Sequence, residues 1–396
     1  MRTDARSDTV ILGYARTPMG GLLGSLSGLT APRLGAAAIR AALARSGAEG
    51  ADVDRVLMGC VLIGGLGQAP ARQAALAAGL PEAVPCTTVS KVCGSGMEAL
   101  ILGHALLRAG LAHLVVAGGM ESMSNAPHLL PDLRGGARLG HRGAVDSLFH
   151  DGLEDAYEPG RLMGSFGDRI AAEYGFSRID QDAYALESLR RALAAQAEHA
   201  FARELVGVSV GAMRVEQDEQ PGKAKPDKIP SLRPAFSPDG TVTAANASSI
   251  SDGAAALVLA DAASARDTGL APLARIVGTA GYAGPPARFA CAPVPAIRTL
   301  LEQVGWDVSE VDLFEINEAF ALVPMIAMRE LGIPHDRLNV HGGACALGHP
   351  LGASGARIVA TLIGALQARG LRRGVASLCI GGGEATALAV EMIGPI

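Results

Sequence analysis

The sequence predicts an α/β fold made of two similar halves, each with a mainly parallel sheet covered by helices. Three observations support this. Strands alternate with helices along the first 120 residues, as in parallel α/β proteins. A second stretch repeats this order at an offset of 258 residues, as between Ala38 and Ala296. The chain is 396 residues long with 49% hydrophobic residues, which is enough for a large core.

The elements of the first half are predicted from apolar runs and from the signals that end them. Gly47 ends the first helix, because glycine suits the left-handed position after a helix. The predicted elements are, in order, a strand within 9–18, a helix over 31–46, a strand over 53–59, a strand over 89–92, a helix over 95–110 and a strand over 113–119.

The second half matches the first without gaps over a helix, a turn and a strand. The matches predict an internal duplication, with the two domains packed face to face. We expect an N-terminal domain over 1–120 plus about 251–271 and a C-terminal domain over 272–396. Residues Ala38, Ile39, Arg40, Leu43, Gly47, Val53 and Asp54 match Ala296, Ile297, Arg298, Leu301, Gly305, Val311 and Asp312.

Residues 121–250 interrupt this pattern and are rich in polar residues, glycine and proline. An insert of this size in an enzyme more often covers a site than extends freely into solvent. The segment 178–200 has the spacing of an amphipathic helix. We therefore expect a loop domain that lies over the site and is anchored by this helix.

Composition argues against several classes of protein. The net charge is −5 and the pI is near 6.0, and no basic stripe is interleaved with aromatics, so no nucleic-acid partner is expected. The six cysteines form no CxxC pair, which favours a reducing compartment. The polar start "MRTDARSD" and the lack of a long uncharged apolar run predict a soluble, cytoplasmic protein without a membrane partner.

Cys93 is the first candidate for chemistry. It lies in "VSKVCGSGMEAL", between a strand predicted to end near Val92 and a helix predicted to begin just after it. The positive end of that helix would favour a thiolate, and Gly94 and Gly96 would let a substrate approach the backbone. The alternative is a small buried cysteine with no reactivity.

Three further segments carry candidate side chains. His349 follows Gly348 in a glycine-rich loop before a helix, where an imidazole can point into a site. Cys379 ends a buried strand before three glycines, whose N–H groups could stabilise an oxyanion. Asn317 falls between a strand and a helix, where α/β sheets place functional side chains, although a helix N-cap would also explain it. A zinc site at Cys345 and His349 lacks further ligands, so no metal is expected.

Five segments resemble the thiolase family, and the likeness covers essentially the whole chain. The combination is far more specific than any one segment. It implies the thiolase fold, in which duplicated βαβαβαββ domains form a five-layer αβαβα arrangement with an inserted loop domain, and a homotetramer built as a dimer of dimers. The segments, in chain order, are "KVCGSGMEAL", "GGMESMSNAP", "NEAFA", "GGACALGHPLGASGAR" and "CIGGGEATA".

The resemblance also implies a role for each candidate. Cys93 is the nucleophile that takes the acyl group, and His349 activates it. Cys379 is the acid and base for the α-carbon. Asn317 holds a water in one oxyanion hole, and the N–H groups of Cys93 and Gly381 form the other. The implied reaction is the reversible Claisen condensation of two acetyl-CoA to acetoacetyl-CoA and CoA.

Coenzyme A thioesters are the implied substrates, and no tightly bound cofactor is expected. The resemblance places six residues around the pantetheine arm, and an apolar tunnel suits such an arm. Two positions depart from well-known biosynthetic members, with Leu162 in place of a histidine and Lys228 in place of a serine. The phosphates are expected near Lys223, Lys225, Lys228 or Arg233. The pantetheine residues are Ser248, Met163, Leu162, Phe236, Ala319 and Phe320.

Other functions remain open at this point. A degradative 3-ketoacyl-CoA thiolase of broader chain length shares the reaction. A ketoacyl synthase would pair its cysteine with two histidines, where this chain has Asn317 and Cys379. A catalytically silent acyl-CoA-binding protein would be free to lose Cys93, His349 or Cys379, yet all three are present. A Cys–His peptidase is a more distant alternative.

Overall fold

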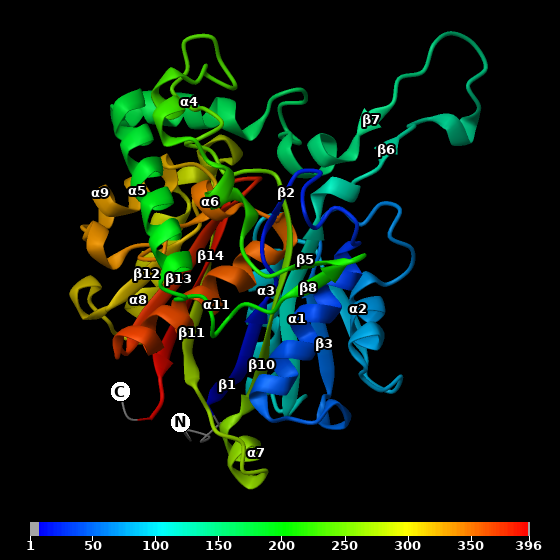
Figure 1. The fold of residues 1–396 in the computed structure, drawn as a ribbon, viewed down its shortest axis with the longest axis vertical. Helices are drawn as coiled ribbons and strands as arrows, with labels where there is room; N and C mark the ends of the chain where they lie inside the picture. Colours follow the sequence, from blue (N-terminus) through cyan, green and yellow to red (C-terminus); the bar gives the residue numbers. More distant parts are fainter. Residues whose placement is uncertain (1–7, 395–396) are drawn as a thin grey trace.

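A computed structural model describes residues 8–394, so the polar start of the chain lies largely outside the described residues. The central feature is one large mixed sheet (Figure 1). Its strands, in spatial order, are β12 (Leu313–Ile316), β13 (Arg373–Ile380), β14 (Glu384–Met392), β11 (Ala274–Ala283), β1 (Thr9–Arg16), β10 (Ser251–Asp261), β5 (Leu114–Ser122), β3 (Arg55–Gly59) and β4 (Cys86–Val89), and β2 (Gly20–Gly21) pairs with β10.

The sheet consists of two halves with the same strand order, which confirms the duplication. β3 runs parallel to β5 and β12 runs parallel to β13, while β10 and β14 are antiparallel to their neighbours. The halves join where β1 and β11 pair over three residues, such as Val10 with Arg275. The two domains therefore meet at a strand edge as well as through packed faces.

Helices complete five layers, as the sequence predicted. α3 (Ser95–Arg108) and α11 (Leu351–Arg369) pack on each other between the two halves. α1 (Ala31–Ser46) and α2 (Pro70–Ala78) cover the first half, and α8 (Pro293–Val304) and α9 (Leu322–Leu331) cover the second (Figure 1). α1 ends at Gly47, whose φ of 72° is left-handed, as expected.

Glycines let the two central helices approach closely. A Cβ on Gly355 would lie 2.4 Å from the backbone nitrogen of Met97, and one on Gly96 would lie 2.8 Å from the carbonyl of Gly352. Any side chain at these positions would push the helices apart. The first turns of α3 and α11 are thereby held together, and the loops that precede them carry Cys93 and His349.

The central helix α11 is buried over Leu351–Leu366. It is the one described helix long and apolar enough to cross a membrane by length and composition, yet 89% of its apolar window is buried inside the protein. Its burial reflects its place between two half-sheets.

The insert lies on one side of the sheet and carries three features. α4 (Met163–Tyr174) and α5 (Arg178–Ala197) pack against the second half, and Ser177 caps α5 in a capping box with Asp180. A two-stranded arm of β6 (His128–Leu129) and β7 (Val145–Asp146) projects from the body (Figure 1). The insert also contains α6 (Glu219–Lys223), β8 (Val208–Val210) and β9 (Met213–Val215). Two further short helices lie outside the insert, α7 (Ala262–Asp267) and α10 (Ala344–Leu347).

Candidate active site

Cys93 lies on a strained turn rather than directly at a strand end. The strand β4 stops at Val89, and α3 begins at Ser95. Val92 has a φ of 44°, which is rare for a β-branched residue and turns the chain sharply before the cysteine. The Ser95 hydroxyl holds this turn, because it accepts from Lys91 N at 2.8 Å and donates to Val92 O at 2.6 Å. The half-buried thiol stays accessible.

The glycine loop after Cys379 packs directly onto this turn. A Cβ on Gly94 would lie 2.3 Å from the side chain of Ile380, so only glycine fits there. The backbone N–H groups of Gly381 and of Cys93 itself lie near the Cys93 sulfur and lower its pKa. In this position they could stabilise the oxyanion that forms on the carbonyl oxygen of a thioester attacked by that sulfur.

His349 is buried, and its tautomer follows from its neighbours. Its Nδ1 lies 2.5 Å from the Ser354 hydroxyl, which donates its single proton to Pro350 O at 2.8 Å. The hydroxyl must therefore accept from Nδ1–H, which leaves Nε2 as a free acceptor. Burial, and next the positive charge of Arg357, lower the pKa of His349 to about 3. The neutral imidazole can act as a base through Nε2.

Asn317 lies beside this imidazole, just after β12. Its Nδ2 is 3.4 Å from His349 Nε2, and its Oδ1 accepts from Arg357 Nη2 at 3.3 Å. The side chain is 1% exposed. The amide nitrogen and the imidazole therefore face the same space, as an oxyanion hole shared by Asn317 and His349 requires.

Cys379 lies near the end of β13 and is buried. Burial raises its pKa well above the ordinary value, and the charge of Cys93 raises it further. The next residue, Ile380, packs against Gly94, so the end of β13 lies beside the Cys93 turn. The structure thus brings together Cys93, Cys379 and Gly381, and separately His349 and Asn317 on the neighbouring loops.

The sequence suggested a thiolate at Cys93 in the resting protein, but the structure favours the neutral thiol. Burial raises the pKa of Cys93 to about 11, although the N–H groups of Gly381 and Cys93 lower it. Desolvation outweighs the helix because α3 begins two residues later, and a dipole acts mainly over the first turn. Both thiols are therefore protonated at neutral pH.

This difference gives a direct prediction about reactivity. Only the thiolate attacks iodoacetamide, so the alkylation rate of Cys93 should rise about tenfold per pH unit between pH 7 and 9. The rate is measured by quenching and peptide mass, with Cys93→Ala marking the background. A rate that does not change with pH in this window would show that the helix, and not burial, controls the pKa.

Glu121 ties the His349 loop to the loop that follows β3. Its carboxylate accepts from Gly352 N at 2.8 Å, in the first turn of α11, and from Val61 N at 3.0 Å and Leu62 N at 3.1 Å. Burial raises its pKa to about 7. The His349 loop is thereby fixed to the loop after β3, on the same side of the sheet as Cys93.

An apolar cavity of about 590 Å³ leads toward these groups. The Phe236 and Phe320 rings form a T-shaped contact there, with ring centroids 6.1 Å apart. Met163 lines this cavity and lies close to Gly381, since its sulfur is 4.0 Å from the position that a Cβ on Gly381 would occupy. The structure gathers here all six residues predicted for the pantetheine arm: Leu162, Met163, Phe236, Ser248, Ala319 and Phe320.

Two family models match almost the whole chain. One is "Thiolase, N-terminal domain", over residues 9–263, and the other is "Thiolase, C-terminal domain", over residues 270–392. The chain belongs to the thiolase family. Among curated relatives, acetyl-CoA acetyltransferase 1 of Arabidopsis thaliana is 50% identical to this thiolase over 393 residues, which is 98% of this chain and 94% of the relative.

Solved structures agree with the fold of this thiolase. The Acat5 thiolase of Ascaris suum in complex with coenzyme A superposes with a TM-score of 0.93 at 42% identity, covering 98% of this chain and all (100%) of that one. The Bacillus anthracis acetyl-CoA acetyltransferase gives a TM-score of 0.95 at 38% identity, covering 99% of this chain and 100% of the other. The thiolase fold predicted from the sequence is confirmed.

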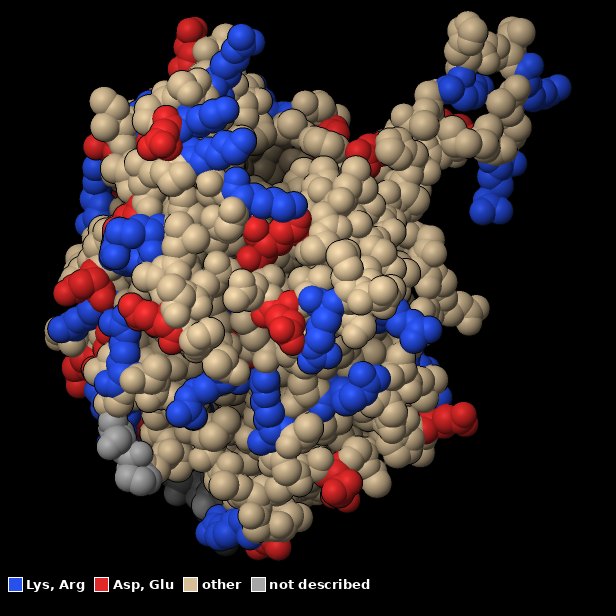
Figure 2. All heavy atoms as spheres, viewed as in Figure 1, with Lys and Arg blue, Asp and Glu red and all other residues tan. Residues whose placement is uncertain are grey.

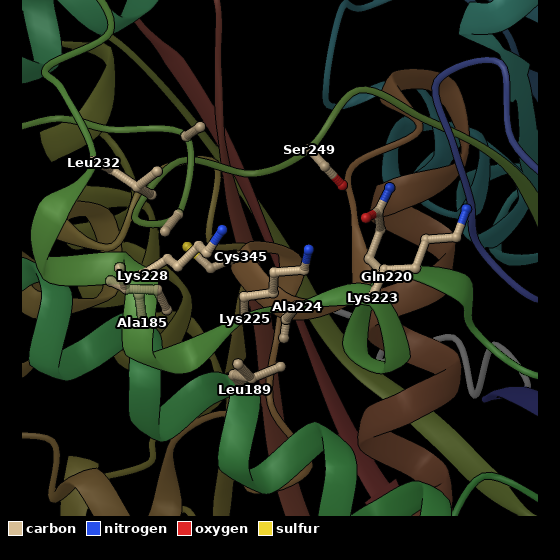
Figure 3. Close-up of a pocket in the computed structure, with 14 residues that line it drawn as sticks. Ala185, Leu189, Gln220, Lys223, Ala224, Lys225, Lys228, Leu232, Ser249 and Cys345 are labelled. Carbon is tan, nitrogen blue, oxygen red and sulfur yellow. The ribbon is translucent and has the colours of Figure 1, made fainter.

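Lys228 of this thiolase lines a neighbouring cavity and not the apolar one. That cavity, of about 330 Å³, also takes in Lys223 and Lys225 and shares Gln220 and Ser249 with the first (Figure 3). Three of the four cations expected near the phosphates therefore gather beside the pantetheine cavity. Lys223 also pairs with Glu219.

Sequence reasoning missed three buried polar residues of this thiolase. Ser354 and Arg357 lie on α11, where Ser354 contacts His349 and Arg357 contacts Asn317. Glu121 lies near the end of β5 and accepts from Gly352 N. Each of the three is a polar residue within an apolar segment, which could have marked it as a candidate. Their partners could not be identified, because they lie far away in the sequence or, for Ser354 and His349, meet only through the shape of the first helical turn.

Proposed function

We propose that this thiolase is an acetyl-CoA acetyltransferase that condenses two acetyl-CoA to acetoacetyl-CoA and CoA through an acyl group on Cys93, and that runs in reverse as a thiolysis. The observation that carries this is that a half-buried thiol, Cys93, lies beside the glycine loop that follows a second, buried thiol, Cys379, and that Met163 of the apolar cavity lies next to this loop. One thiol can hold the acyl group while the other handles the α-proton.

In the first half-reaction, Nε2 of His349 takes the proton of Cys93 as the sulfur attacks the thioester carbonyl. The N–H groups of Cys93 and Gly381 stabilise the resulting oxyanion. As the carbon–sulfur bond to coenzyme A breaks, the leaving thiolate takes the proton of Cys379. Free CoA departs, and a Cys379 thiolate remains beside the acyl-enzyme.

The acyl-enzyme does not oppose this state, because a thioester at Cys93 carries no charge that would repel a thiolate at Cys379. In the second half-reaction Cys379 removes the α-proton of a new acetyl-CoA, while imidazolium at His349 and a water held by Asn317 stabilise the enolate. The enolate attacks the acyl group, and the released Cys93 thiolate recovers its proton from His349.

A chain-length series tests this function. Incubation with acetyl-CoA should add one acetyl group to the peptide that contains Cys93, measured by mass. With free CoA, thiolysis of acetoacetyl-CoA should exceed that of long-chain 3-ketoacyl-CoA by at least about tenfold in kcat/KM, an effect of roughly 1.4 kcal/mol on the barrier. Equal values would favour a degradative thiolase of broader chain length, and no acetylation would favour a silent binding protein.

The coenzyme A phosphates are proposed to bind at the cavity that contains Lys223, Lys225 and Lys228. Figure 3 shows these side chains reaching over the opening from α6 and the segment that follows it. Because Lys228 replaces a smaller residue expected from the family, it offers an added cation for a phosphate. Leu162 in the apolar cavity leaves one polar partner fewer for the acyl-pantetheine.

The assembly is proposed to be a homotetramer. β4 is an open edge strand of the sheet, which suits pairing with a second copy. The projecting arm exposes Leu130 by 54% and Leu139 by 88%, and its tip is basic (Figure 2). Light scattering should give the mass of four chains, and a monomer would refute this assembly.

A further inference from the structure

Arg357 is a buried charge in an otherwise apolar helix. It lies on α11, is 1% exposed, and sits among residues that are themselves buried. Within residues 8–394, its Nε and Nη1 atoms have no hydrogen-bond partner. Burying a guanidinium costs free energy unless it is paired and hydrogen-bonded, so packing alone does not account for this residue.

Its acidic neighbour does not account for it either. Glu315 approaches only to 3.8 Å, and its Oε1 has no hydrogen-bond partner among the described residues. Burial raises the pKa of Glu315 to about 8, so at neutral pH this carboxyl is mostly protonated. Among the residues that the structure describes, the one hydrogen bond that Arg357 donates goes from Nη2 to Asn317 Oδ1, at 3.3 Å.

This bond decides which way the Asn317 amide faces. A guanidinium only donates, so the amide oxygen must point to Arg357 and the amide nitrogen must point away from it. The nitrogen then faces His349, at 3.4 Å from Nε2. Rotated by half a turn, the amide would present its oxygen to a developing enolate and would repel it.

We propose that Arg357 is a positioning residue for the condensation step, which fixes the Asn317 amide so that its N–H side faces the reacting thioester. The inference rests on the proposed function, because it assumes that Asn317 serves the second half-reaction. Arg357 acts through Asn317 and does not touch the substrate. The oxyanion hole made by the Cys93 and Gly381 N–H groups is independent of it.

The test is a double-mutant cycle of Arg357→Met and Asn317→Ala, assayed for each half-reaction. Arg357→Met keeps the apolar stem and removes the donor. It should lower kcat for condensation by about 10- to 100-fold, somewhat less than the loss of an oxyanion donor itself. The rate of Cys93 acetylation by acetyl-CoA should not fall, because removal of the Arg357 charge raises the basicity of His349. In the Asn317→Ala background, Arg357→Met should cause no further loss.

The matched control is Glu315→Gln, which mimics the protonated carboxyl and leaves the bond between Arg357 and Asn317 in place. It should keep wild-type kcat within about threefold, since the amide stays fixed. If Arg357→Met is insoluble, Arg357→Lys takes its place in the cycle. It keeps the charge but lacks the planar fork, and it should lose about tenfold in condensation.

The outcomes distinguish failure of the positioning role of Arg357 from failure of the proposed function. Additive losses in the cycle, or an Arg357 variant with wild-type condensation, would overturn the positioning role while leaving the proposed function intact. Equal losses in both half-reactions would indicate general damage to the fold and would also overturn it. Wild-type condensation by Asn317→Ala alone would remove Asn317 from the proposed mechanism and the inference with it.

Discussion

Cys93→Ala is expected to abolish acyl-enzyme formation and to lower kcat/KM for acetoacetyl-CoA thiolysis on the order of 10⁵-fold or more, as loss of a covalent nucleophile does in other enzymes. The half-buried thiol is the acceptor on which the Gly381 and Cys93 N–H groups converge. Cys379 cannot replace it, because Cys379 is buried within β13. Intact mass after incubation with acetyl-CoA and a thiolysis assay measure the two effects.

The control is Cys86→Ala, on the strand that leads into the same turn. Cys86 is half-buried like Cys93, and its thiol donates to Val84 O at 3.3 Å. Acetylation and turnover should match the wild type there. Cys93→Ser should fold like the wild type and remain inactive, because a serine hydroxyl has a far higher pKa than a thiol. Near wild-type turnover in Cys93→Ala would show that the acyl group is carried elsewhere.

The fold was predictable because its signals are local or repeated. Alternating apolar runs, and glycines such as Gly47 after helices, define each element. The offset between Ala38 and Ala296 shows that the elements occur twice. The join between β1 and β11 was not predictable, because pairing of Val10 with Arg275 depends on how two finished halves meet.

The candidate residues of the site could be selected from the sequence, but the contacts that hold them could not. Cys93, His349, Asn317 and Cys379 each stand at a strand or helix boundary, which a sequence reveals. The tautomer of His349 depends on Ser354, whose role follows only from a helical turn that directs its hydroxyl proton to Pro350 O.

The protonation state of Cys93 shows where a local rule fails. A helix start lowers a thiol pKa, and the sequence places one after the cysteine. Burial acts in the opposite direction and is stronger here. How far a side chain is buried depends on residues from the whole chain, such as Ile380 against Gly94.

Cys379→Ala is expected to lower condensation by about 10²- to 10⁴-fold, the range that a general acid or base contributes. The variant lacks the group that removes the α-proton, and the Asn317 and His349 pair can only stabilise the enolate. Deuterium exchange into the methyl group of acetyl-CoA, followed by mass spectrometry, reports that step without the condensation. It should fall with kcat in Cys379→Ala.

Alkylation distinguishes a lost base from a damaged site. Iodoacetamide needs only the Cys93 thiolate, and Cys379 is protonated at neutral pH and so adds no charge beside it. Cys379→Ala should therefore be alkylated at Cys93 at the wild-type rate. Cys345→Ala, a half-buried cysteine in the neighbouring cavity, should keep both reactions. Retention of methyl exchange by Cys379→Ala would require another base, and His349 Nε2 would be the remaining candidate. The His349 imidazole would then take both the proton of Cys93 and the α-proton of acetyl-CoA.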